Sequence, residues 1–145
     1  MINDQIKITG QVRIIVTGAD GQVKDQREIK NLVVTVGKEF IAARMVGTPT
    51  AMSHMALGST NTAAAAGNTA LGAELGRVAL ASSTASGAVV TYTATFPAGT
   101  ATGAAVEAGV FNASSAGTML CRTVFAVVNK GADDAMSVTW SITVS

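Results

Sequence analysis

The sequence IKITGQVRIIV, at residues 6–16, shows the periodicity that decides the fold. Its even-numbered positions are apolar or glycine, whereas most of its odd-numbered positions are polar. Successive side chains of a β-strand point to opposite faces of a sheet. This segment therefore predicts a strand with one buried face and one solvent-facing face.

The segment at residues 136–144 repeats the same alternation near the other end of the chain. Its apolar side chains share one parity, and serine and threonine occupy the other; the apolar set is Met136, Val138, Trp140, Ile142 and Val144. We predict a core strand whose serine and threonine face is exposed to solvent or contacts a partner.

Other short β-branched or alternating runs predict further strands, separated by turn signals rich in glycine, asparagine, aspartate and serine. A second strand is expected to begin at Gln22, and the remaining runs lie at residues 32–36, 52–57, 77–82, 89–96, 105–111 and 119–128. Eight or nine strands of this kind favour an all-β fold, an antiparallel β-sandwich or jelly roll in a single domain spanning residues 1–145.

One or two short helices are expected within this β framework. Phe40, Ile41 and Met45 share one helical face in residues 38–47, and the glycine at position 47 can end that helix. Residues 69–76 have the capacity for one helical turn. Between them, the small polar residues 59–68 predict a long loop without a side chain large enough to anchor it.

The scarcity of titratable side chains argues against an enzyme. The chain has one histidine, one cysteine, one tryptophan and one tyrosine, and beyond Val46 it has few charged residues. Catalysis needs such groups gathered as nucleophile, acid, base or metal ligand. We predict a structural or binding protein with no catalytic residue, no cofactor and no metal site.

The charge balance and the apolar pattern exclude other classes. The net charge is +1, with basic and acidic residues intermixed, which argues against a nucleic-acid partner. No run of about 18 apolar residues exists to cross a membrane, and the first nine residues do not resemble a secretion signal. Cys121 stands alone, so we expect a buried thiol and folding in the cytoplasm.

Two glutamates and two arginines are the main candidates for chemistry. Glu74 and Glu107 could form an acid and base pair of the glycosidase kind. Each is followed in the sequence by an arginine, Arg77 or Arg122. Their apolar neighbours favour another reading, because a buried charge is costly unless it is paired. We therefore expect a Glu–Arg ion pair that fixes strand register or closes a subunit contact.

Other catalytic signatures are weak or missing from the sequence. His54 has no second histidine or cysteine beside it, so we expect a hydrogen-bonded histidine on an edge strand and not a zinc ligand. The sequence has no glycine-rich phosphate loop and no Gly-x-Ser-x-Gly elbow. Nucleotide binding and a hydrolase triad are therefore not supported.

Four segments resemble small virion proteins of tailed bacteriophages: NLVVTVGKEFIAARMVG, MALGSTNTAAAAGNTALGAELGR, EAGVFNASSAGTMLCRTVF and VTWSITV. The resemblance spans most of the chain, from about Asn31 to Val144. It implies a capsid decoration or cement protein, made in the host cytoplasm, that binds the outside of the head and clamps adjacent major capsid proteins. It also implies a homo-oligomer, trimeric or dimeric, with repeated weak contacts.

The charged segments are the expected contact regions of such a protein. Residues 1–7 can form an extended N-terminal arm, and residues 24–30 form a charged stretch; the candidate contact residues are Asp4, Lys7, Lys24, Arg27 and Lys30. The alternative is a tail-fibre or baseplate module that binds a tail partner or a host receptor. A receptor-binding module would be expected to carry exposed aromatic rings on loops, and here the rings lie mostly in predicted strands.

Overall fold

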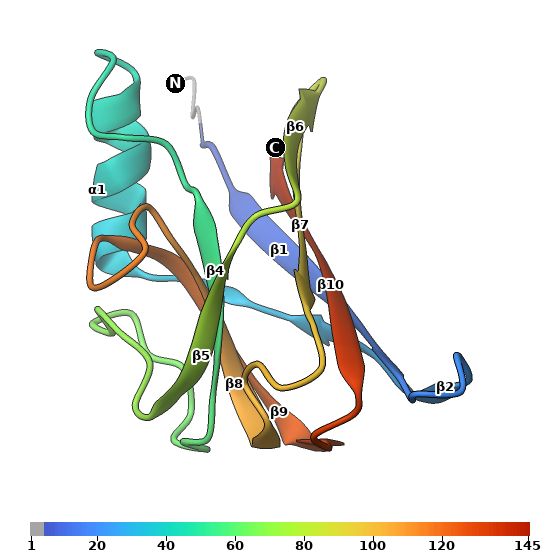
Figure 1. Cartoon of the computed structure of the whole chain (residues 1–145). Coiled ribbons are helices and arrows are strands. Elements are labelled where there is room, and N and C mark those ends of the chain that lie inside the picture. The colour runs from blue at the N-terminus through green and yellow to red at the C-terminus, as the bar shows by residue number, and fades with distance from the viewer. Residues whose placement is uncertain (1–4) are drawn as a thin grey trace.

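The computed structural model describes residues 5–145, and this part of the chain forms ten strands and one helix (Figure 1). The helix is α1 (Thr35–Arg44). The strands are β1 (Ile8–Thr17), β2 (Val23–Lys30), β3 (Leu32–Val33), β4 (His54–Gly58), β5 (Glu74–Ala79), β6 (Ser82–Ser86), β7 (Val89–Phe96), β8 (Gly103–Phe111), β9 (Met119–Lys130) and β10 (Ala135–Val144).

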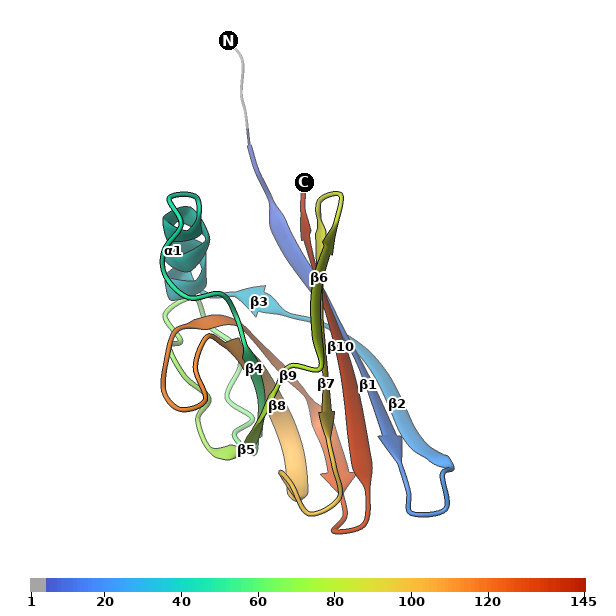
Figure 2. The same cartoon turned by 45° about the horizontal axis from the view of Figure 1, so that its top comes forward.

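The strands form two antiparallel sheets of five strands each. The β1 sheet has the order β2-β1-β10-β7-β6, and the β8 sheet has the order β3-β9-β8-β4-β5. Figure 2 shows β2, β1, β10 and β7 side by side, with α1 at the end of the molecule where β1 begins. The predicted all-β antiparallel sandwich is confirmed, and the jelly-roll connectivity stays a prediction.

The core lies between the two sheets and follows the alternation of the first and last strands. Val12 and Ile14 of β1 and Trp140 of β10 are fully buried. Gly10 shares their parity but has another role, because a Cβ there would overlap the Asn31 side chain. Cys121 is also buried, as predicted, and burial raises the pKa of its thiol well above the ordinary value.

The predicted strand at residues 32–36 is wrong beyond Val33, and the helix begins at Thr35, earlier than expected. The Val34 N–H makes a last bond to β9, to the Leu120 carbonyl oxygen at 3.3 Å, while the Val34 carbonyl already accepts the Lys38 N–H. Val34 thus makes both the last hydrogen bond of the strand and the first hydrogen bond of the helix. Tertiary packing overrides the β-branched preference of this run.

Two further predictions were wrong around β5. Residues 69–76 do not form a helical turn, because β5 begins at Glu74. The predicted strand at residues 77–82 is two strands in different sheets. The crossing lies at two consecutive residues: the Leu80 N–H donates to Ser53 beside β4, and the Ala81 N–H donates to Thr93 of β7.

The start of β1 is tied to the end of β10. Lys7 and Ser145 exchange two backbone hydrogen bonds, of 2.6 and 2.8 Å, so Lys7 of the predicted arm extends the β1–β10 pairing. Asp4 and the rest of residues 1–4 lie outside the described residues. Within residues 5–145, no helix has the length and apolar character needed to cross a membrane.

Candidate functional site

A buried ion pair lies on the outer face of the β8 sheet. Arg122 of β9 donates from Nε to Glu107 Oε1 of β8 at 3.1 Å, and its Nη2 lies 3.0 Å from the same oxygen. Both side chains are almost completely buried. The structure thus brings together one of the two glutamates and one of the two arginines selected from the sequence.

The Glu107 carboxylate accepts three backbone hydrogen bonds as well. They come from the N–H groups of Thr60, Gly72 and Ala73, at 2.9, 3.0 and 3.0 Å. Burial alone would raise the pKa of Glu107, but these N–H groups and the Arg122 guanidinium outweigh it and hold the pKa below the ordinary value. Glu107 is therefore ionised at neutral pH and has no proton to give as a general acid.

Residues 59–73, which we call the covering loop, are held onto the sheet by this pair. Arg122 donates to Asn68 Oδ1 at 3.1 Å and to the Thr62 carbonyl at 3.0 Å. Leu71 packs on a small apolar cluster outside the main core. The predicted long loop at residues 59–68 is confirmed, and two charged side chains from the sheet supply the anchor that the loop's own small side chains do not.

Glu74 and Arg77 form a second, separate pair on the same face. Arg77 Nη2 lies 2.7 Å from Glu74 Oε1, and the guanidinium stacks over the Phe111 ring at 3.9 Å from its centroid. Arg77 also donates to the carbonyls of Ala113 and Ala116. The two glutamates thus each bind an arginine, on strands separated by β4, and do not form the acid and base pair considered above.

His54 is not on an edge strand, contrary to the prediction. It lies in β4, which pairs with β5 on one side and β8 on the other. Its Nδ1 is 2.8 Å from Ser53 Oγ. In the described part of the chain, no group of three or more histidine, cysteine or acidic side chains could hold a metal ion.

The predicted contact residues Lys24 and Arg27 are engaged within the chain. Lys24 Nζ lies 3.0 Å from Asp134 Oδ2. Arg27 pairs with Asp25 at 3.1 Å and donates to the carbonyls of Ala126 and Val127, which joins β2 to β9 across the sandwich. Lys7 and Lys30 have no acidic group within 4.0 Å among residues 5–145.

The sequence interpretation missed a polar cluster around Asp134 at the turn between β9 and β10. The Lys24 ammonium, with the Gly131 N–H, holds the pKa of Asp134 below its ordinary value. Lys130 is buried beside it and donates to the Pro97 carbonyl at 2.9 Å. Burial lowers the pKa of Lys130, and the Asp134 charge opposes that effect. The cluster joins β2, the β9–β10 turn and the segment after β7.

Glu107 and Asp134 predict a loss of stability in acid. Both carboxyl pKa values are lower in the folded chain, so the unfolded chain binds more protons as the pH falls. The stabilisation is present above the unfolded pKa, about 4, and is lost as the pH drops through the folded values. Urea unfolding from pH 7 to pH 3 should show this slope. Glu107→Gln and Asp134→Asn should each reduce it, and unchanged slopes in both variants would contradict the assignment.

The outer face of the β1 sheet, by contrast, carries hydroxyl side chains in register, and we call it the hydroxyl face. Strand pairing aligns these side chains in two rows across β10, β7 and β6: Ser141, Thr91 and Thr84 in one, and Thr139, Thr93 and Ser82 in the next. Gln11 and Arg13 of β1 extend the two rows without a hydroxyl. The serine and threonine side chains that alternate with apolar residues in the predicted strand at residues 136–144 lie on this face.

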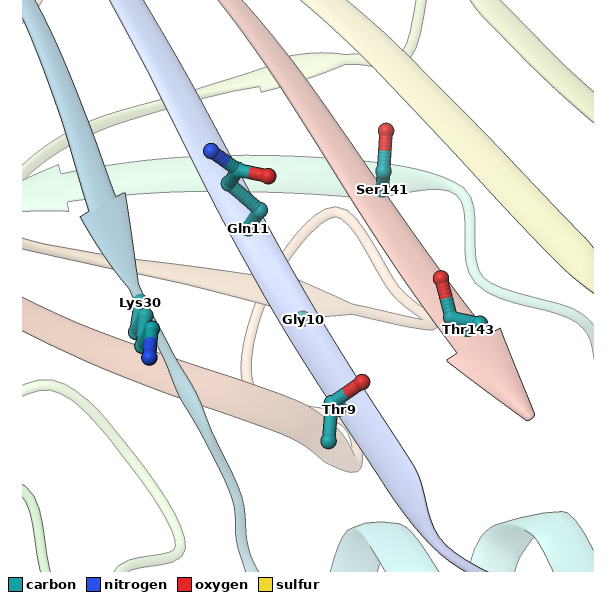
Figure 3. A pocket seen from close by; sticks show the side chains of 6 residues that line it. All are labelled: Thr9, Gly10, Gln11, Lys30, Ser141 and Thr143. Atoms are coloured by element: carbon teal, nitrogen blue, oxygen red, sulfur yellow. The ribbon is translucent and has the colours of Figure 1, made fainter. Parts of the chain in front are cut away.

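An open trough lies at one end of the hydroxyl face (Figure 3). Gln11, Ser141 and Thr143 present short polar groups along it, and Lys30 stands on the side of β2. Lys30 is the only titratable side chain among the residues that line the trough. The arrangement can donate and accept hydrogen bonds, but it gathers no acid, base and nucleophile.

Comparisons of this chain with protein-family models, with curated proteins and with solved structures find no match. Its function is therefore inferred from the geometry above and from the sequence resemblance.

Proposed function

We propose that the protein is a bacteriophage capsid decoration protein that binds the outer surface of the head through its hydroxyl face and stabilises contacts between major capsid proteins. The observation that carries this proposal is the contrast between the two outer faces. Charged side chains and the covering loop occupy the β8 sheet, whereas the hydroxyl face of the β1 sheet is open.

The chemistry of the hydroxyl face suits a protein surface. Serine and threonine have few rotamers to lose, and each hydroxyl both donates and accepts hydrogen bonds. Their rows lie on adjacent hydrogen-bonded strands of the five-stranded β1 sheet, so the groups are already in position before binding. A small-molecule site would be concave with a few convergent groups, whereas this surface is broad and repetitive.

The contacts within the protein suit a role in which it bears mechanical load. The Glu107–Arg122 pair fixes the covering loop, and the Arg27 contacts join the two sheets. A domain held in this way can transmit force between neighbours on a lattice. Many copies, each with a modest interface, would then stabilise the head collectively.

A binding assay with heads that lack the protein tests the hydroxyl face. Purified protein should sediment with such heads. Ser137→Lys, on the hydroxyl face beside Thr95, and Thr84→Lys should each weaken binding at least about tenfold, because each places a long charged side chain within the contact. Ser115→Lys, in the exposed turn between β8 and β9, is the matched control and should bind normally. Equal binding by all three variants would contradict the proposal.

The copy number in purified virions separates the proposal from its alternative. Gel densitometry should find the protein at a level near that of the major capsid protein. A few tens of copies or fewer would instead favour the tail-fibre or baseplate module.

A further inference from the structure

An apolar groove lies between α1 and the residues that lead into β1. Figure 2 shows α1 and the start of β1 at the same end of the molecule. Ile6 and Ile8 form one wall, and Ile41 and Ala42 of α1, with Met45 directly after the helix, form the other. Ile8 and Ile41 also pack against the main core, so the groove is the open end of the sandwich interior.

This end of the molecule holds the most exposed apolar side chains in the described residues. Met45 is 85% exposed, Val46 81% and Ile6 74%, more than any other large hydrophobic residue. Large apolar side chains gathered at one place on a surface commonly mark a site of association.

A free strand edge borders the groove. Lys7 directs both its backbone groups toward Ser145 of the β10 side, so in an antiparallel ladder Ile6 and Ile8 direct theirs to the opposite side. On that side the β1–β2 register begins only at Gln11, and the Asn31 N–H reaches no further than the Gly10 carbonyl. The edge at Ile6 and Ile8 therefore has no neighbouring strand in the described chain.

The charges beside the groove have one sign. Lys7 and Lys38 line it, and no acidic group lies within 4.0 Å of either ammonium among the described residues. The groove is therefore apolar with a positively charged border.

A second copy of the chain offers a matching edge. In an antiparallel pair centred on Ile6, the Ile6 N–H and carbonyl of each copy would bond to those of the other, which would satisfy both free edges at once.

We propose that two copies of the chain pair through this edge. Residues 5–7 of each copy run antiparallel to those of the other, so that the two Ile6 residues lie opposite each other. The contact is isologous, since each edge binds the same edge of the other copy. It brings the exposed ends of both α1 helices to one face of the joined sheet. The pairing does not depend on the proposed function, because it concerns the protein alone.

The mass of the purified protein in solution tests this pairing. Sedimentation over a range of concentrations should show a dimer. Ile6→Asp should raise the dissociation constant by about 100-fold, because it places a charge at the centre of the contact.

Val23→Asp provides the matched control. Val23 is an exposed apolar residue of β2 outside the groove, so this variant should dimerise like the wild type. A wild type that stays monomeric, or an Ile6→Asp variant that dimerises normally, would overturn the pairing. Binding to heads is measured separately, so failure of this inference is distinguishable from failure of the proposed function.

Discussion

Replacement of Arg122 by methionine is expected to lower the free energy of unfolding by about 3–5 kcal/mol. The methionine fills much of the same space but leaves the Glu107 carboxylate buried without its guanidinium. It also removes the donors to Asn68 and to the Thr62 carbonyl, which hold the covering loop. Urea denaturation followed by circular dichroism measures the change.

A local measurement links this loss to the covering loop. Hydrogen exchange at the amides of Thr60, Gly72 and Ala73, which donate to Glu107, should accelerate in the Arg122→Met variant. Arg13→Met, on the exposed side of β1, is the matched control and should change stability by less than about 0.5 kcal/mol. A stability of Arg122→Met within about 1 kcal/mol of the wild type would contradict the assigned role of the pair.

Replacement of Gly37 by alanine is expected to lower the free energy of unfolding by about 3 kcal/mol. A Cβ at Gly37 would overlap the backbone carbonyl of Leu120 in β9, so α1 could no longer lie as close to the sheet. Alanine favours a helix over glycine by about 1 kcal/mol, which is too little to offset this overlap. Thermal and urea unfolding both measure the result.

Gly67→Ala is the control for this substitution. A Cβ added at Gly67 would meet no atom within 4 Å beyond its immediate chain neighbours, so alanine there should leave stability unchanged or raise it slightly. If Gly37→Ala were as stable as Gly67→Ala, close packing of α1 on β9 would not be needed for the fold.

The sequence predicted the strands whose two faces differ. β1, β7 and β10 alternate between apolar and polar residues, and their positions agree closely with the structure. β6 was missed because Ser82–Ser86 is exposed along its whole length, so it has no apolar face to reveal it. The helix start was missed because Thr35 and Val36 resemble a strand locally.

The candidate site was predictable in its residues but not in its arrangement. Apolar surroundings showed that Glu107 and Arg122 would need partners, and a Glu–Arg pair was expected. The sequence could not show that this pair also binds the covering loop, because Thr60 and Ala73 contribute backbone N–H groups, which every residue type but proline has. The internal partners of Lys24 and Arg27 likewise depend on contacts between distant segments.

The crossing at Leu80 and Ala81 has a mechanical consequence. Neighbouring residues there are bonded to opposite sheets, and consecutive Cα atoms are only about 3.8 Å apart. The two sheets should therefore resist sliding past each other. A force applied to one sheet would be transmitted to the other sheet and to any protein bound to it.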